Sequence, residues 1–183
     1  MPTRAVVWRD PVIRFFLVAG LLYFGWYLIY GQVLKPGGAA DRALIGNLVE
    51  VSGAMLRLAG HELIPEPANA EGLRTIGVQG GHLLWIGNAC NGLGLFAVYL
   101  IFLIAYPGPW RHKLWFGAVG LLGIHLINAL RIAVLCVVVK YDYEWLNFNH
   151  DYTFYVVVYG FVFLLWAIWV KRFAGRRRPG PAT

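Results

Sequence analysis

Hydrophobic positions along the chain gather into long blocks instead of alternating with polar ones. A helix needs about 20 apolar residues to cross the roughly 30 Å hydrocarbon core of a bilayer, and four blocks approach or exceed that length. They cover residues 12–30, 90–106, 114–139 and 152–170. The first block ends in the bulky run GWYLIYGQ, with no small-residue cleavage site, which favours a retained anchor over a signal peptide. The pattern predicts four transmembrane helices in a single membrane domain, residues 1–183.

The segment between the first two blocks, residues 31–89, is too long for a simple turn. Apolar residues recur every three or four positions over residues 40–58. This spacing predicts an amphipathic helix that lies on the outer leaflet or against the bundle. The stripe consists of Leu44, Leu48, Val51, Met55 and Leu58.

A second element follows, in which Ile76 and Val78 are separated from Leu84 and Ile86 by two adjacent glycines. This arrangement predicts a short β-hairpin with a two-residue turn at the glycine pair, residues 80–81. The hairpin leads the chain into the second hydrophobic block. The expected fold class is an all-α polytopic membrane protein with about four transmembrane helices, an outer-face amphipathic helix and a short β-hairpin.

Composition agrees with a membrane protein and excludes other classes. Hydrophobic residues make up 59% of the 183 residues and charged residues 14%, with a mean hydropathy of +0.60. A soluble domain carries about 25% charged residues. The net charge of +7 does not indicate nucleic-acid binding, because five of the sixteen basic residues lie in the tail, residues 171–183. We expect the lipid bilayer as a partner and no nucleic acid.

The distribution of charge predicts the orientation in the membrane. With both termini in the cytoplasm, the inner segments and the adjoining Arg14 hold ten Lys or Arg and one acidic residue, Asp10. The outer segments then hold five basic and eight acidic residues. Basic residues near the ends of spans favour the cytoplasmic side. We therefore expect a multi-pass protein with both termini, including the basic tail, in the cytoplasm.

Arg131 lies inside the third block, nine residues before the outer end of the block at Lys140. At 1.5 Å per residue this is roughly 13 Å below the boundary, where a guanidinium is costly unless it is paired or faces a polar cavity. Asn128 precedes it by one helical turn and His125 by two, so the three form a polar stripe. We interpret the stripe as the face turned toward the bundle; a structural arginine bonded to carbonyl groups is the alternative.

Cys90 begins the second block within GNACNGL, among the small and amide residues Asn88, Asn91 and Gly92. Small residues let backbones approach, amides offer hydrogen-bond donors, and a helix N-terminus favours a thiolate. Cys90 is thus a candidate nucleophile, with inert packing as the alternative. Cys136 lies in LCVVV without polar neighbours and fits inert packing.

His150 lies in NFNHDY at the outer start of the fourth block, so the predicted topology brings it to the same membrane face as Cys90. A cysteine nucleophile needs a base, and histidine accepts a proton near neutral pH. Asp151 is a candidate for orienting His150. Arg131, from a third span, could stabilise a developing oxyanion. These residue types predict a Cys-His-Arg catalytic site; a histidine that only binds lipid headgroups is the alternative.

The runs GNACNGLGLF, INALRIAVL and NHDYTFYVV, in this order and spacing, resemble the exosortase/archaeosortase family. The similarity covers roughly residues 72–170. Members carry a cysteine in the first motif, an arginine three residues after an asparagine in the second, and a histidine at the start of a late span. The resemblance therefore implies catalytic roles for Cys90, Arg131 and His150. Asn91 stands where serine is usual, which suggests a subclass with a different signal motif.

The resemblance also implies an activity: a membrane cysteine protease or transpeptidase. Such an enzyme cleaves the C-terminal sorting signal of exported proteins on the outer side of the membrane and transfers them to an acceptor, often in bacteria with exopolysaccharide loci. The substrate partner would be a membrane-anchored protein with a short C-terminal motif, a transmembrane helix and a basic cluster. The implied location is the bacterial cytoplasmic (inner) membrane, with the active site outside.

Other functions remain open on the residues alone. A non-catalytic membrane subunit or small transporter would pair Arg131 with an anionic substrate and relay protons through His125. Metal or haem ligation by His82, Cys90, His125 and His150 lacks a close spacing such as C-x-x-C, so no metal or cofactor is expected. Tryptophans expected at membrane interfaces or facing lipid are Trp8, Trp26, Trp145, Trp166 and Trp169.

Overall fold

The computed structural model describes residues 10–35, 38–66, 74–141 and 154–174. Within these ranges, four helical segments are long and apolar enough to cross a membrane. They are Pro11–Leu34, Asn88–Ala105, Trp110–Tyr141 and Val156–Phe173. The predicted fold class is confirmed: a polytopic all-α membrane protein that also carries an amphipathic helix and a small antiparallel sheet.

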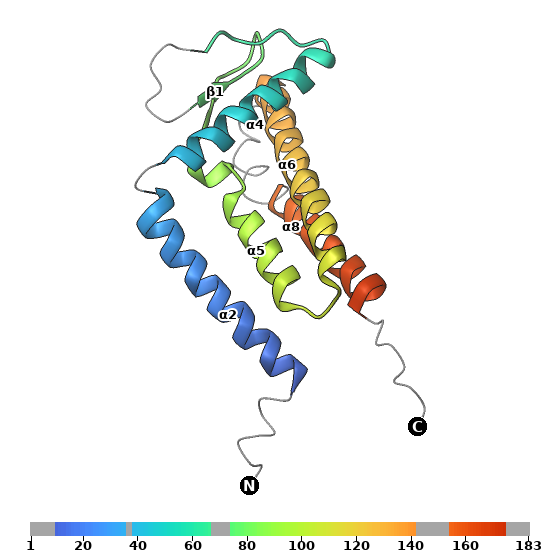
Figure 1. Ribbon diagram of the computed structural model, residues 1–183. Helices are drawn as coiled ribbons and strands as arrows, with labels where there is room; N and C mark the ends of the chain where they lie inside the picture. The colour runs from blue at the N-terminus through green and yellow to red at the C-terminus, as the bar shows by residue number, and fades with distance from the viewer. Residues whose placement is uncertain (1–9, 36–37, 67–73, 142–153, 175–183) are drawn as a thin grey trace, which may run out of the picture.

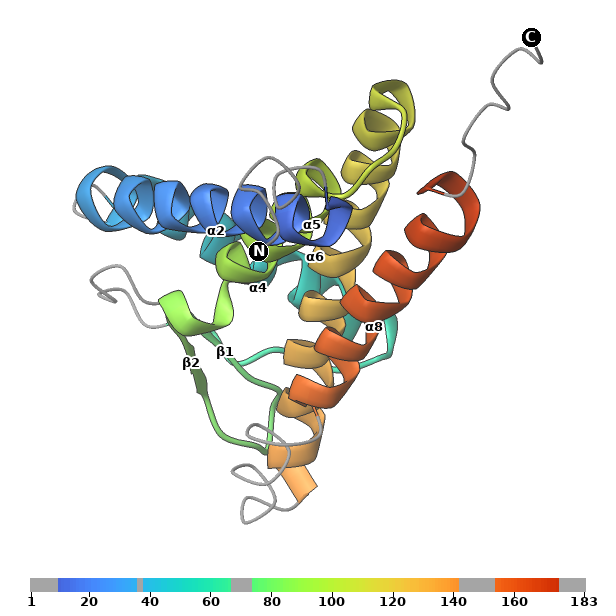
Figure 2. The same cartoon turned by 90° about the horizontal axis from the view of Figure 1, so that it is seen from below.

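The first span consists of helix α2, Pro11–Ile29, and a π-helical turn η1, Tyr30–Leu34. An Asp-Pro pair defines its start, because the Asp10 carboxylate accepts a hydrogen bond from the Val12 amide at 2.8 Å and proline occupies the first turn. No side chain of α2 is buried. Since α2 packs mainly on α5, Leu93–Ala105, and lies away from α8, most of its apolar surface faces lipid (Figure 2).

Helices α5, α6 (Trp110–Tyr141) and α8 (Phe154–Trp169) pack against one another. Gly120 on α6 allows a close approach to α5, because a Cβ at this position would lie 2.1 Å from the Tyr99 hydroxyl oxygen. That hydroxyl donates a hydrogen bond to the Phe116 carbonyl at 2.8 Å. Small residues at such crossings let membrane helices pack backbone to backbone.

The connection between α5 and α6 is shorter than the hydrophobic blocks suggest. The sequence leaves residues 107–113 between two spans, but α6 begins at Trp110, directly after a proline-glycine-proline turn. Lys113 therefore belongs to the helix. Its Nζ donates hydrogen bonds to the carbonyls of Ile104 and Tyr106, both at 2.8 Å, and so satisfies free acceptors at the end of α5.

Trp169 is buried within the bundle, so the expectation of a lipid-facing position is wrong for this residue. Its side chain is 0% exposed. The ring centroid lies 5.5 Å from that of Phe116 and 5.0 Å from that of Phe173 in η4, Val170–Ala174. The turn after α5 closes over the ring, since a Cβ on Gly108 would lie 2.4 Å from it.

Helix α4, Ala39–Leu58, confirms the amphipathic helix predicted for residues 40–58. It crosses one end of the bundle and packs along α6, with the hairpin beside it (Figure 1). The start of α2, the turn between α5 and α6, and the end of α8 lie at the opposite end (Figure 1). The helix thus packs against the bundle, which was one of its two predicted placements.

The buried side of α4 is displaced from the predicted stripe. Leu48 is buried as expected, but Leu58 is 90% exposed, and Ile45 and Leu56 are buried in its place. Ser52 shares this seam and donates a hydrogen bond from its hydroxyl to the Ala129 carbonyl of α6 at 2.9 Å. A purely hydrophobic stripe misplaces the seam because small and polar side chains such as Ser52 form part of the contact.

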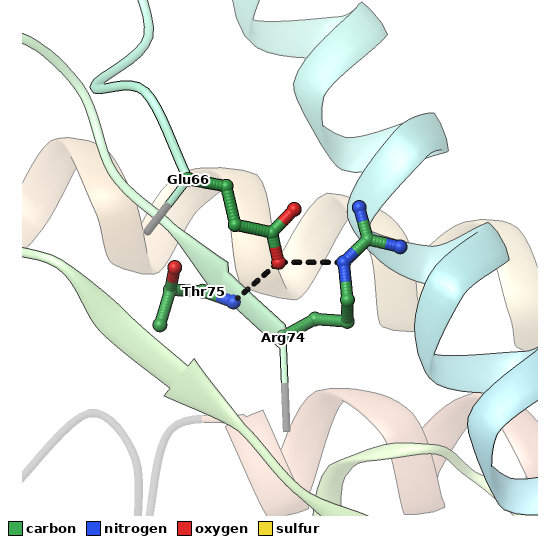
Figure 3. Close-up of polar contacts among 3 residues, drawn as sticks. All are labelled: Glu66, Arg74 and Thr75. Carbon is green, nitrogen blue, oxygen red and sulfur yellow. Dashed lines mark hydrogen bonds and ion pairs between the residues drawn. The ribbon is translucent and has the colours of Figure 1, made fainter. Parts of the chain in front are cut away.

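Strands β1, Arg74–Ile76, and β2, Leu84–Ile86, form the predicted antiparallel hairpin. Glu66 anchors β1, because its Oε1 accepts hydrogen bonds from Arg74 Nε at 2.5 Å and from the Thr75 amide at 3.2 Å (Figure 3). The hydrogen bond from Arg74 lowers the pKa of the Glu66 carboxyl, and the same bond raises the pKa of Arg74.

The hairpin turn lies one residue earlier than predicted. The Gly81 amide donates to the Val78 carbonyl at 2.9 Å, so the central residues are Gln79 and Gly80. Gly80 has φ +80°, and a type II turn requires this sign at its third position. The two-residue turn at the glycine pair is therefore wrong. Ladder pairing stops at Ile76, because Val78 pairs instead with Leu63 from the preceding segment.

Candidate active site

A cavity of about 300 Å³ lies where two groups of buried apolar residues meet along α6. One group joins α4, the hairpin and the second half of α6; the other joins α5, the first half of α6 and α8. Four parts of the chain form the walls: the first span, the segment that leads into α5, helix α6 and helix α8. The lining residues are Trp26, Tyr30, Asn88, Ala89, Cys90, Asn91, Gly92, Leu93, Gly94, Leu95, Asn128, Arg131, Val158 and Tyr159.

Cys90 ends a 3-10 turn, η2, Asn88–Cys90, that precedes α5. It is half-buried and lines the cavity. Gly92 caps α5 with φ +79°, a conformation that favours glycine. A Cβ at Gly92 would also lie 3.2 Å from Asn128 Nδ2. The absence of a side chain at Gly92 therefore lets the turn before α5, including the Cys90 backbone, lie close to α6.

Asn128 and Arg131 bring α6 into the same cavity. Asn128 is buried, and its Nδ2 donates a hydrogen bond to the Cys90 carbonyl at 2.7 Å. Arg131 follows one helical turn later, is half-buried, and lines the cavity with Cys90. Cys90 and Arg131, from separate spans, thus line one cavity, and the side-chain amide of Asn128 holds the backbone of the cysteine.

The sequence of the chain matches a known family. Residues 7–174 correspond to the family described as transmembrane exosortase (Exosortase_EpsH). The chain belongs to the transmembrane exosortase family. The match spans the cavity residues from Trp26 to Tyr159, and membership gives membrane protein sorting by transpeptidation as the general class of activity. No curated protein and no solved structure matches the exosortase chain.

The other predicted supporting residues of the exosortase also meet at the cavity. Asn88, Asn91 and Gly92 all line it. Asn91 is 2% exposed, and its Oδ1 accepts a hydrogen bond from the Leu93 amide at 2.8 Å, at the start of α5. The amide of Asn91 therefore caps the helix that follows the cysteine.

His125 separates from the polar stripe of the exosortase. Its Nε2 lies 2.7 Å from Oδ1 of Asn47 on α4, outside the set of cavity-lining residues. Only Asn128 and Arg131 of the stripe line the cavity. Cys136 is 0% exposed, with its Sγ 3.9 Å from the Ile76 carbonyl oxygen, a position that fits the inert packing expected from its sequence. His150 and Asp151 lie outside the described residues.

Three aromatic residues at the cavity are absent from the predicted site. Trp26 was expected at a membrane interface or facing lipid and not at a site, but it lines the cavity and stacks on Tyr30 with ring centroids 5.6 Å apart. Tyr159 contributes from α8. The π-helical turn that begins at Tyr30 ends the regular helix at the cavity, and such turns are frequent at functional sites. In the sequence, these three aromatic residues lie in apolar spans, where nothing distinguishes them from aromatic residues that face lipid.

Asp41, beside the cavity, is also absent from the predicted site. It lies in the first turn of α4, is 1% exposed, and accepts hydrogen bonds from Asn91 Nδ2 and the Tyr30 hydroxyl. One signal was present in the sequence: Asp41 precedes Ile45 and Leu48 by four and seven positions, which places an acid on the buried seam. Among the described residues, no three His, Cys, Asp or Glu side chains form a metal-binding group.

Proposed function

We propose that this exosortase cleaves membrane-anchored proteins with Cys90 as the nucleophile and Arg131 as its electrostatic partner, and passes the product to an acceptor. The substrate is an exported protein that ends in a short sorting motif, a transmembrane helix and a basic cluster. The reaction takes place on the outer side of the bacterial cytoplasmic (inner) membrane. Both termini of the enzyme then lie in the cytoplasm, as the charge distribution indicates.

One observation carries the proposal: Cys90 and Arg131 line the same cavity although they are forty-one positions apart and belong to different spans. A cation held within a membrane span is usually functional. Cys136 provides the contrast, since it is the second free cysteine and is fully buried among apolar side chains. Cys90 is the described cysteine that a substrate can reach.

The first chemical step joins the substrate to Cys90. The thiolate attacks the carbonyl carbon of the scissile peptide bond, and the carbonyl oxygen takes up negative charge. Arg131 stabilises this oxyanion, because a fixed charge in a partly buried site opposes developing charge without reorganisation. Collapse of the intermediate breaks the C–N bond. The N-terminal part of the substrate remains as a thioester on Cys90, and the C-terminal signal leaves as an amine.

His150 is assigned the proton transfers. It accepts the thiol proton of Cys90, gives a proton to the leaving amine, and accepts one from the acceptor as the acceptor attacks the thioester. Cys90 leaves that second step as a thiolate. The assignment rests on the position of His150 in the NHDY run at the start of the fourth span, with Asp151 as the candidate orienting partner.

Intact-protein mass spectrometry of a co-expressed candidate substrate tests the proposal. Wild-type enzyme should remove the C-terminal helix of the substrate, and any added mass on the product distinguishes transfer from hydrolysis. Cys90→Ala should abolish processing, whereas Cys136→Ala should retain it. Arg131→Lys should fail as well, because an ammonium cannot reproduce the planar guanidinium fork.

Two results would contradict the proposal. Processing that continues unchanged in Cys90→Ala would exclude this residue as the nucleophile. Identical substrate masses with and without wild-type enzyme, over several candidate substrates, would instead favour the non-catalytic subunit or transporter. If the protein has that function, substitution of Arg131 or His125 should impair it, whereas substitution of Cys90 should have no effect.

A further inference from the structure

Asp41 is a buried carboxyl that the proposed chemistry does not use. It is 1% exposed and occupies the first turn of α4. Burying a carboxylate is costly unless hydrogen bonds replace the lost water. A helix N-terminus offsets part of this cost through its free amides and dipole. The position is thus suited to a carboxylate.

Two cavity-lining residues donate hydrogen bonds to Asp41. Asn91 donates through Nδ2, and the Tyr30 hydroxyl lies 3.3 Å and 3.4 Å from the two carboxylate oxygens. These partners come from the segment that enters α5 and from η1, which both contact α4 at the same end of the bundle (Figure 1). One buried carboxyl therefore joins three elements around the cavity.

The contact with Asn91 acts directly on the position of the cysteine. Asn91 follows Cys90 in the chain, and its Oδ1 accepts the Leu93 amide at 2.8 Å while its Nδ2 reaches Asp41. On the other side, Asn128 holds the Cys90 carbonyl at 2.7 Å. The turn that carries Cys90 is therefore tied to α4 through Asp41 and to α6 through Asn128.

We infer that Asp41 is a positioning residue that fixes Cys90 toward the cavity through Asn91. The inference rests on the proposed function, in which Cys90 is the nucleophile. Arg131 lies on α6, and the Asn128 contact holds only the Cys90 carbonyl side of the turn to that helix. The Asp41–Asn91 bond fixes the other side of the turn, so both contacts are needed to set the position of Cys90 relative to Arg131. A misplacement of about 1 Å can cost about 100-fold in rate.

A reciprocal exchange tests this inference. In Asn91→Asp two carboxylates face each other, and the turn should shift, with a fall of about 10- to 100-fold in the single-turnover rate of cleavage. In the double variant Asp41→Asn with Asn91→Asp, the new amide donates to the new carboxylate. That carboxylate still accepts the Leu93 amide, and the oxygen of the new amide still accepts the Tyr30 hydroxyl. The rate should return to within about fivefold of wild type.

Asn47→Asp is the matched control, because it places a new carboxylate on the same helix, away from the cavity, and keeps an acceptor for His125. It should cleave at the wild-type rate. A second readout needs no substrate: the rate at which a water-soluble iodoacetamide alkylates Cys90 in the membrane-embedded enzyme. This rate should change in Asn91→Asp and return in the exchanged pair.

The outcomes separate the two proposals. If Asn91→Asp matches wild type in both readouts, or if the exchanged pair is no better than Asn91→Asp, the positioning role is wrong while Cys90-dependent cleavage stands. If neither wild type nor any variant cleaves but the alkylation rate changes in Asn91→Asp and returns in the exchanged pair, the contact positions Cys90 and the proposed function is wrong. Should Asn91→Asp not fold, cleavage at near wild-type rate by the exchanged pair supports the contact, and failure of that pair overturns it.

Discussion

Gly92 shows how a single residue serves the site in two ways. Its φ of +79° suits glycine, and it lies where a Cβ would press on Asn128 Nδ2 at 3.2 Å. The same amide group holds the Cys90 carbonyl. Backbone conformation and side-chain space thus converge on one position beside the nucleophile.

Gly92→Ala should therefore lower the rate of substrate cleavage by about 10- to 100-fold, because the new methyl group displaces the Asn128 amide from Cys90. Gly160→Ala is the control, since a Cβ there meets no heavy atom within 4 Å. Single-turnover cleavage with each variant measures the effect. Equal rates in the two variants would show that the left-handed cap and its close contact with Asn128 are not needed for activity.

At the residue scale, the sequence predicts those residues of the candidate site that differ in polarity or type from their neighbours in the chain. Arg131 and Asn128 are polar within an apolar span, and Cys90 lies in a cluster of small and amide residues. Trp26 and Tyr30 were beyond prediction, because aromatic residues in a membrane helix occur equally on lipid-facing surfaces. Their roles depend on where η1 ends relative to α4, which is a property of tertiary packing.

At the element scale, helix α6 is shaped by the small residues on its faces. Gly120 admits the Tyr99 ring, and Gly123 would place a Cβ 3.0 Å from the Phe161 ring of α8. The helix thus contacts α5 and α8 through different glycines. The sequence predicts these spans well, because hydrophobic length is a strong signal, but the seam of α4 poorly, because Ser52 and Asp41 form part of it.

Gly120→Ala should destabilise the contact between α5 and α6 by about 1–3 kcal/mol, since the hydroxyl oxygen and ring atoms of Tyr99 lie 2.1–2.7 Å from the new Cβ and must move. Reversible unfolding in mixed detergent micelles measures the change in the free energy of unfolding. Gly20→Ala on α2, where no atom lies within 4 Å, should leave the stability nearly unchanged. A similar loss in both variants would refute tight packing at this crossing.

The hairpin carries a pH-dependent contact between Glu66 and Arg74. Because the pKa of Glu66 is lowered in the folded chain, its contribution to stability is complete above its ordinary pKa, near 4.5, and is lost as the pH falls through the lowered value. Its size should be about 0.2–1 kcal/mol, as for other exposed ion pairs.

Glu66→Gln tests this contribution, since the amide oxygen still accepts the Thr75 amide and only the charge is lost. Hydrogen exchange of the β1 amides should be faster in Glu66→Gln than in wild type at pH 6 to 7, after correction for intrinsic rates. The difference should vanish well below pH 4. A difference that persists unchanged in acid would exclude the ion pair as its cause.

At the scale of the whole molecule, the site is assembled from segments that are distant in sequence. The first span, α4, the turn before α5, and α6 meet at the end of the bundle that carries the hairpin (Figure 1). The buried clusters on either side of the cavity hold α6 along most of its length. Polar groups therefore meet in a space that rigid apolar packing defines, which is the arrangement that a preorganised catalytic site requires.

Identification of the covalent intermediate is the most direct test of Cys90 as the nucleophile. Wild-type enzyme in membranes would be mixed with substrate, without an acceptor, quenched in acid within one turnover, and digested for mass spectrometry. We expect the peptide containing Cys90 to carry the N-terminal part of the substrate as a hydroxylamine-sensitive thioester. Arg131→Ala should greatly reduce this adduct, and the peptide containing Cys136 should stay unmodified. Cleavage of the substrate with no adduct on Cys90, or with the adduct on another residue, would contradict this assignment.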